Sequence, residues 1–100
     1  MPKYFEGLGL VFFFYSREYS GNKLEPVHVH VSKGTQSDIN DKFWVNFDGT
    51  VAHDTSHSTI LSSKDLNKAS LLIHQNYEFI IMKWKNYFGE ISFNDKVFNN

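Results

Sequence analysis

The sequence contains no cysteine, only two prolines and no long apolar run. Without cysteine the chain can form no disulfide, no thiolate metal ligand and no cysteine nucleophile. The apolar stretch at residues 10–15 is far too short to cross a bilayer, and no small-residue cleavage site follows it. We therefore expect a soluble, cytoplasmic protein that does not have a membrane as its partner.

An excess of basic charge is also missing. Ten Lys and Arg residues face eleven Asp and Glu residues, which gives a formal net charge of −1. Proteins that bind nucleic acids usually carry a basic patch, because contacts to phosphate dominate their affinity. The closest approach to such a patch here is Lys83 with Lys85, so the composition argues against nucleic acid as a partner.

Aromatic residues, in contrast, are abundant. The chain has ten Phe, five Tyr and two Trp among its 100 residues. Each buried ring removes a large area from water, so a few of them can hold a small domain together. The length fits one domain spanning residues 1–100.

Four segments read as strands, at about residues 7–16, 27–32, 42–47 and 50–53. The first is apolar on both faces, as in a central or doubly covered strand. Asp48-Gly49 favours a tight hairpin between the last two, since Gly permits positive φ. The polar segments 17–26, 33–41 and 53–62 are predicted as turns or loops.

A single long helix is predicted at about residues 64–88. Ser63 is a plausible N-cap, Asp65 favours the first turn, and Gly89 suits the position after the C-terminus. Apolar side chains recur every three or four residues along it. A break near residues 74–76 stays open, and residues 89–100 form a short tail. The predicted fold is α+β: a small antiparallel sheet of three to four strands packed against this helix.

The best candidate for chemistry is a His-x-His pair. Val27, Val29 and Val31 alternate with His28 and His30, so we expect the valines to point inward and both imidazoles to leave the opposite face. Two such rings can converge on one divalent transition metal, because imidazole suits zinc, iron, copper or nickel. Further ligands could come from the polar loop, in the form of His53, Asp54 and His57. The alternative is a solvent-facing strand whose rings bond only to neighbouring groups.

Trp44 and Tyr15 extend this predicted face. Both can share the outer side of the sheet with His28 and His30, and together the four form a candidate binding surface. Under the alternative interpretation, the helix or the 53–62 loop covers these rings.

The order of these motifs resembles the domain-of-unknown-function 4160 family. The matching elements are FFFYS at residues 12–16, Pro-x-His-x-His-Val at residues 26–31, Lys-Phe-Trp at residues 42–44, and a helix that ends in Trp84, Tyr87 and Phe88. The resemblance implies small bacterial proteins of unassigned biochemistry, with His28 and His30 as hallmark positions. It also implies a partner of the domain-of-unknown-function 2442 type and a role in a toxin–antitoxin pair. This sequence departs from the family pattern at Val27 and in two longer loops.

Three hypotheses about function follow. The first is a protein-interaction module that binds a partner or forms a homodimer. The second is a metal-dependent enzyme, a hydrolase or nuclease, that uses the His-x-His site. The third is binding of single-stranded RNA by exposed aromatic rings, which the missing basic patch disfavours.

Overall fold

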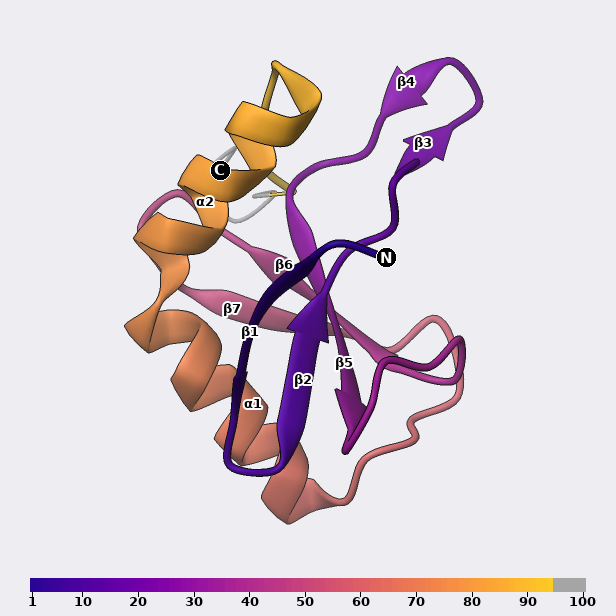
Figure 1. Ribbon diagram of the computed structural model, residues 1–100, viewed down its shortest axis with the longest axis vertical. Coiled ribbons are helices and arrows are strands. Elements are labelled where there is room, and N and C mark those ends of the chain that lie inside the picture. Colours follow the sequence, from indigo (N-terminus) through magenta and orange to yellow (C-terminus); the bar gives the residue numbers. More distant parts are fainter. Residues whose placement is uncertain (95–100) are drawn as a thin grey trace.

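Five strands form one antiparallel sheet in the computed structural model, which describes residues 1–94 (Figure 1). They are β1 (Lys3–Gly7), β2 (Leu10–Phe13), β5 (His28–Lys33), β6 (Asp41–Val45) and β7 (Val51–Asp54), in that order across the sheet. A separate short hairpin, β3 (Tyr19–Ser20) and β4 (Lys23–Leu24), is inserted between β2 and β5. The predicted α+β class with an antiparallel sheet is therefore confirmed, but the prediction of three to four strands is too low.

The N-terminal part of the sheet differs from the predicted single strand at residues 7–16. The chain turns at Leu8 and Gly9, both of which have positive φ (53° and 79°), as a tight turn between twisted strands requires. β1 and β2 then pair from Gly7 with Leu10 up to Lys3 with Phe13. The sequence pattern did not predict this turn, because Leu is an unusual residue at positive φ.

The predicted hairpin at Asp48-Gly49 is present between β6 and β7. Gly49 has a φ of 87°, and its amide donates to the carbonyl of Asn46. The Asp48 carboxylate accepts from the backbone N–H of Thr50 at 3.0 Å, which closes the turn. The local signal was sufficient here because the turn depends on adjacent residues alone.

Two helices take the place of the predicted single one. α1 (Ser63–Gln75) begins after Ser62, whose hydroxyl accepts from the N–H of Asp65, so Ser62 is the N-cap and not Ser63. Asn76 leaves helical geometry at φ −124° and ψ 19°, and α2 (Tyr77–Phe88) follows directly. Gly89 ends α2 at φ 81°, as predicted. The predicted tail is irregular over residues 89–94, and its remainder lies outside the described residues.

The hydrophobic core lies between the helices and one face of the sheet (Figure 1). Val29 and Val31 of β5 are fully buried there, together with Phe43 of β6. The helices contribute Ala69, Ile73, Ile80 and Trp84, none of which is exposed. Over the part of the chain that is described, neither helix has the length and apolar character needed to cross a membrane.

Candidate metal centre

His28 and His30 leave β5 on the face opposite the buried valines. His28 lies across from Trp44 of β6, and His30 lies across from both Lys42 of β6 and Phe13 of β2. Residues directly opposite each other in an antiparallel pair point to the same side. The predicted alternation is therefore present, and it brings the two imidazole rings to a centroid distance of 4.9 Å.

This face is covered, which corrects the expectation of an outer surface. His28 is 0% exposed and His30 only 8%. The ring of Tyr15 lies 4.6 Å from that of His30, and the rings of Trp44 and Trp84 lie 5.3 and 5.1 Å from that of His28. Tyr15 and Trp44 are themselves half-buried. The predicted four residues do come together, but as the lining of an interior site.

The cover is the segment between β2 and β5, which had been predicted as a loop. It contains the β3–β4 hairpin, and Leu24 of this hairpin joins the hydrophobic core. Burial of the Leu24 side chain stabilises the position in which this segment folds back onto the sheet. β2 also ends at Phe13, opposite His30, so no β2 residue pairs with His28. Tyr4 occupies this position instead, and its hydroxyl donates to the carbonyl of His28 at 3.2 Å.

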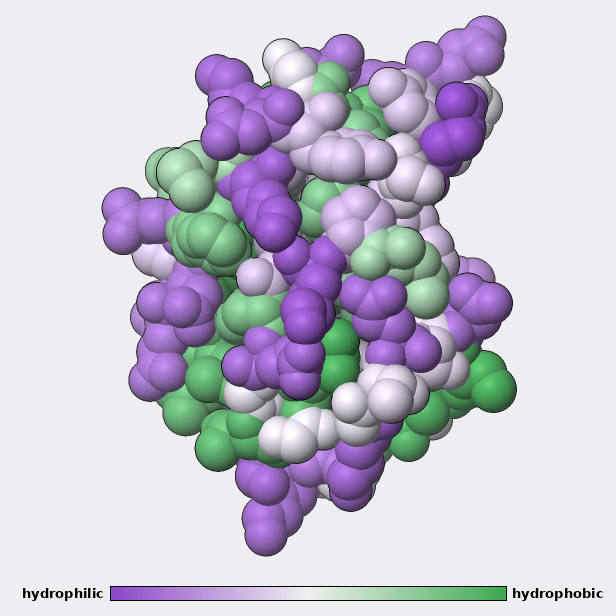
Figure 2. Space-filling view, in the orientation of Figure 1, coloured by the Kyte–Doolittle hydropathy of each residue, from purple (hydrophilic) through white to green (hydrophobic). Residues whose placement is uncertain are grey.

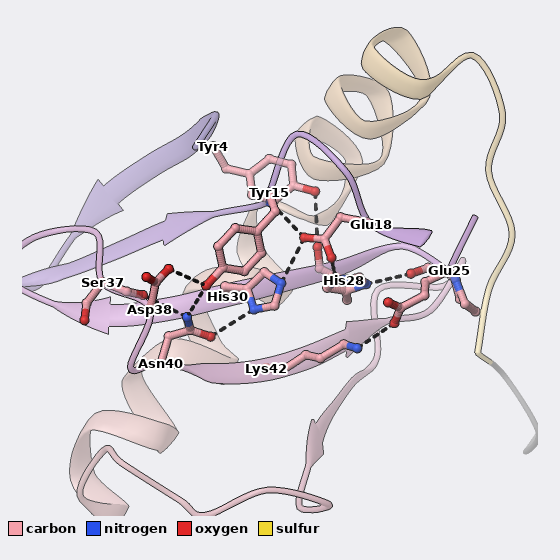
Figure 3. A network of polar contacts seen from close by, with 11 residues as sticks. Tyr4, Tyr15, Glu18, Glu25, His28, His30, Ser37, Asp38, Asn40 and Lys42 are labelled. Carbon is pink, nitrogen blue, oxygen red and sulfur yellow. Dashed lines mark hydrogen bonds and ion pairs between the residues drawn. The ribbon is translucent and has the colours of Figure 1, made fainter. Parts of the chain in front are cut away.

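Glu18, carried by the covering segment, connects the two histidines (Figure 3). Its Oε1 lies 2.9 Å from Nε2 of His28, and its Oε2 lies 2.9 Å from Nε2 of His30. The backbone N–H of Tyr15 also donates to Oε2 at 2.8 Å. Glu18 is not among the ligands predicted from the sequence. No local signal marks it, because its partners lie 10 and 12 residues farther along the chain and meet it only in the folded state.

Opposing effects set the ionisation of Glu18. Its burial alone would raise the pKa of the carboxyl group, but hydrogen bonds from protonated His28 and His30, and the positive charge of these rings, lower that pKa to about 2. Glu18 is therefore ionised as long as positive charge lies next to it. A buried carboxylate with no compensating positive charge would be strongly unfavourable.

The second ring nitrogen of each histidine has a partner that defines the tautomer. Nδ1 of His28 lies 2.8 Å from the carbonyl oxygen of Pro26, which can only accept, so this nitrogen carries a proton. Nδ1 of His30 lies 2.9 Å from Oδ1 of Asn40. The amide nitrogen of Asn40 donates to the Ser37 carbonyl and to the Tyr15 hydroxyl, which fixes which end of the amide faces His30. Nδ1 of His30 therefore also carries a proton.

Nε2 of His30 lies in hydrogen-bonding geometry to Oε2 of Glu18, to which it donates when the ring is protonated. When the rings are neutral, both Nε2 atoms present lone pairs. These lone pairs point into the space beside the Glu18 carboxylate, where one donor atom from each of the three residues lies within 4.8 Å of the others. Two ligands at right angles, each about 2.1 Å from an ion, lie about 3 Å apart. The observed spacings of 2.9 Å are close to that value and are also those of hydrogen bonds. The ligands of a tetrahedral ion would lie about 3.4 Å apart, so the three groups would separate slightly to hold one. Glu18, His28 and His30 together are called the Glu-His-His cluster below.

The other predicted ligands lie elsewhere. His53 pairs with Phe43 across β6 and β7, so it faces the helix side of the sheet, where its Nε2 contacts Asp41 at 3.1 Å. Asp54 accepts from the N–H and hydroxyl of Ser56. Asp54 and His57 line a neighbouring pocket, but within residues 1–94 the donor group that could hold an ion comprises the Glu-His-His cluster without them.

A pocket of about 490 Å³ opens beside the cluster. Glu18 and His30 form part of its lining, together with Tyr15, Asn40 and Lys42. Asp41 fixes another wall, because its buried carboxylate accepts from the backbone N–H groups of Ile60 and Leu61 at 3.1 and 2.7 Å. The cluster is therefore interior, yet two of its three members reach a solvent-accessible cavity.

Comparison with known protein families gives a match for most of the chain. Residues 9–85 match a family described as a domain of unknown function (DUF4160). No curated protein and no solved structure matches the chain. The match covers more than half of the chain and includes β2, both histidines, Glu18 and most of the two helices. The chain belongs to the family of the domain of unknown function 4160.

Proposed function

We propose that this domain binds a divalent transition-metal ion through Glu18, His28 and His30, and that it acts as a metal-dependent hydrolytic enzyme. One observation carries the proposal: both Nδ1 atoms donate to other groups, and both Nε2 atoms lie 2.9 Å from oxygens of the same buried carboxylate. Lone pairs and a carboxylate repel one another unless positive charge lies between them. A shared cation satisfies all three groups at once.

Protons on both rings are the competing source of that charge. A proton on His30 would form a hydrogen bond to Oε2 of Glu18, 2.9 Å away. His28 argues against protons on both rings, because its Nε2 is fully buried and forms no well-directed hydrogen bond. The nearest carboxylate oxygen lies 2.9 Å away but off the direction in which a ring N–H would point. Such an offset is expected when the nitrogen and the oxygen bind the same ion at right angles. Without an ion, the two atoms would lie close together without forming a good hydrogen bond.

The surrounding contacts also resemble those of metal sites. Histidine ligands usually donate their second ring N–H to a carbonyl or carboxylate, which orients the ring. Pro26 and Asn40 serve His28 and His30 in this way. Two imidazoles with one carboxylate suit zinc or iron(II) and leave coordination positions free, as in catalytic sites. An ion there would lower the pKa of a bound water and so produce a nucleophile.

The test is metal content in protein purified without a histidine tag and then exposed to Zn²⁺ or Co²⁺. We expect one tightly held ion per chain, and we expect Glu18→Gln and His30→Ala to lose it. Glu25→Gln is the matched control, because Glu18 and Glu25 flank the same hairpin but Glu25 pairs with Lys42 at 2.7 Å. Equal metal content in Glu18→Gln and Glu25→Gln would remove the proposal.

A second candidate function is protein interaction, including formation of a homodimer, through the outer side of the helices. Phe79 and Met82, three residues apart in α2, are 42% and 52% exposed, and Leu71 of α1 is 52% exposed. Figure 2 shows hydrophobic surface on the side of the molecule where the helices lie. Exposed apolar patches often mark contact sites. A partner of the domain-of-unknown-function 2442 type, as in a toxin–antitoxin pair, would belong to this function.

Sedimentation of the wild-type chain and of Phe79→Lys tests the homodimer. We expect a concentration-dependent dimer that the added charge disrupts. A monomer at every concentration in both proteins would exclude self-association by this face.

A further inference from the structure

We infer that the pocket beside the Glu-His-His cluster admits an uncharged or cationic ligand, which binds the metal ion through oxygen, and that it disfavours phosphate esters. This inference rests on the proposed metal site and narrows its substrate class. It favours a hydrolase that acts on small carbonyl compounds over a nuclease.

The free positions of the ion would face the pocket. Glu18 and His30 both line the pocket, whereas His28 is fully buried behind them. The three protein ligands therefore approach from the walls and the rear of the site. A ligand entering from the pocket would meet the ion directly, without any movement of the sheet.

The lining of the pocket is strongly acidic. Its carboxylates are Glu18, Glu25, Asp38 and Asp54, because that of Asp41 is turned inward to backbone N–H groups. Lys42 is its single Lys or Arg residue, and its histidines are His30 and His57. Lys42 is already engaged, because its Nζ pairs with Glu25 at 2.7 Å and lies 4.2 Å above the ring of Trp44. The lining therefore stays net negative even with a divalent ion in place. An approaching phosphate dianion would be repelled, while a neutral carbonyl would not.

Two carboxylates are available to act on such a ligand. Asp38 and Asp54 both line the pocket, and within residues 1–94 neither forms an ion pair with a Lys, Arg or His side chain. Asp38 accepts only a long hydrogen bond, 3.4 Å, from the Tyr15 hydroxyl. Both carboxylates can attract an amino group on a ligand and repel an anion. The exposed side chains of Ile39 and Ile60 add apolar surface for the body of a small molecule.

The experiment uses the full chain loaded with Co²⁺, whose visible absorption reports changes in coordination. Acetohydroxamic acid, which enters the pocket uncharged at neutral pH and releases a proton to solvent when it chelates the ion as acetohydroxamate through two oxygen atoms, is titrated against inorganic phosphate at constant ionic strength. We expect acetohydroxamate to change the spectrum in a saturable way, and phosphate to require about tenfold higher concentration or more. Cobalt content after dialysis checks that neither ligand has removed the ion.

The acidic side chains are tested by the double variant Asp38→Asn/Asp54→Asn. We expect it to hold cobalt normally and to bind phosphate several times more tightly than the wild type. Glu78→Gln/Glu90→Gln is the matched control, because both residues are exposed and lie outside the pocket lining, and the change in net charge is the same. This control should leave phosphate binding unchanged.

The outcomes distinguish the proposed metal site from the inference about the ligand of the pocket. Phosphate that binds as tightly as acetohydroxamate would overturn the inference about the ligand. A cobalt spectrum that neither probe changes would also overturn it, because no position would be open to the pocket, while the metal site itself would stand. Failure to take up cobalt would overturn the metal site and the inference together.

Discussion

Asn40 orients the ring of His30, because its amide oxygen lies 2.9 Å from Nδ1 of His30. The same amide donates to the Ser37 carbonyl at 2.8 Å and to the Tyr15 hydroxyl at 2.9 Å, so its orientation has no freedom left. Asn40 thereby directs Nε2 of His30 toward Glu18 without touching Glu18 itself. We regard it as a positioning residue for the proposed ion.

Replacement of Asn40 therefore tests the tautomer argument. We expect Asn40→Ala to weaken Co²⁺ binding about 10- to 100-fold, the usual effect of losing such an orienting partner. Asn40→Asp keeps an oxygen acceptor for Nδ1 and should retain most of the affinity. Affinity is measured by competition with a chelator, with Asn86→Ala on the exposed surface of α2 as the control. Wild-type affinity in Asn40→Ala would contradict the role given to this residue.

Binding of the ion should stabilise the fold. An ion present at about 100 times its dissociation constant adds about 2.7 kcal/mol to the free energy of unfolding. In a domain of this size that amount corresponds to an increase in Tm of about 10–20 °C. Thermal unfolding with Zn²⁺ and with a chelator measures the difference. Glu18→Gln should show no such increase, and an equal increase in that variant would mean that the ion binds elsewhere.

Tyr4 should make the protein sensitive to alkali. Burial raises the pKa of its phenol well above the usual value of 10.0, and the charge of Glu18 raises it further. The folded state therefore keeps a proton that the unfolded chain loses above about pH 10, so stability is complete below that pH and falls above it. We expect the free energy of unfolding to fall more steeply in wild type than in Tyr4→Phe, by about 1.4 kcal/mol per pH unit.

Tyr4→Phe also lowers the free energy of unfolding by an amount that does not depend on pH, and this loss must be separated from the pH dependence. Tyr4→Phe loses the hydrogen bond to the His28 carbonyl, which is worth about 1 kcal/mol at every pH. Urea unfolding at a series of pH values distinguishes the two effects. Parallel pH profiles for the two proteins would show that the phenol does not titrate as its burial requires.

Gly49 is expected to resist substitution more than other glycines in turns. A Cβ at this position would lie 2.7 Å from the ring of Tyr77, and φ is 87°. Gly21 has a similar φ of 64°, but open space surrounds it. Gly21→Ala should cost about 1–2 kcal/mol from backbone strain alone. Gly49→Ala should cost clearly more, as measured by urea unfolding, and equal costs would show that Tyr77 moves aside freely.

The sequence alone determined the features that depend on near neighbours. Alternation along residues 27–32 placed the valines inward and both imidazoles on the other face, because side chains in a strand point to opposite sides in turn. Asp48-Gly49 specified its hairpin, and Gly89 specified the end of the second helix, because each depends on the backbone freedom of one residue. The abundance of aromatic residues indicated that aromatic side chains would form much of the core.

Only the tertiary structure decided what surrounds those imidazoles. The turn at Leu8 runs against local preference, because Leu rarely adopts positive φ. The break left open near residues 74–76 falls at Asn76, a weak helix former whose side chain donates to the Leu72 carbonyl. Glu18 reaches His28 and His30 because Leu24 anchors its segment in the core, and the register of β6 and β7 turns His53 away. Such distant contacts depend on the closure of a loop and on pairing between strands, and neither leaves a periodic trace in the sequence.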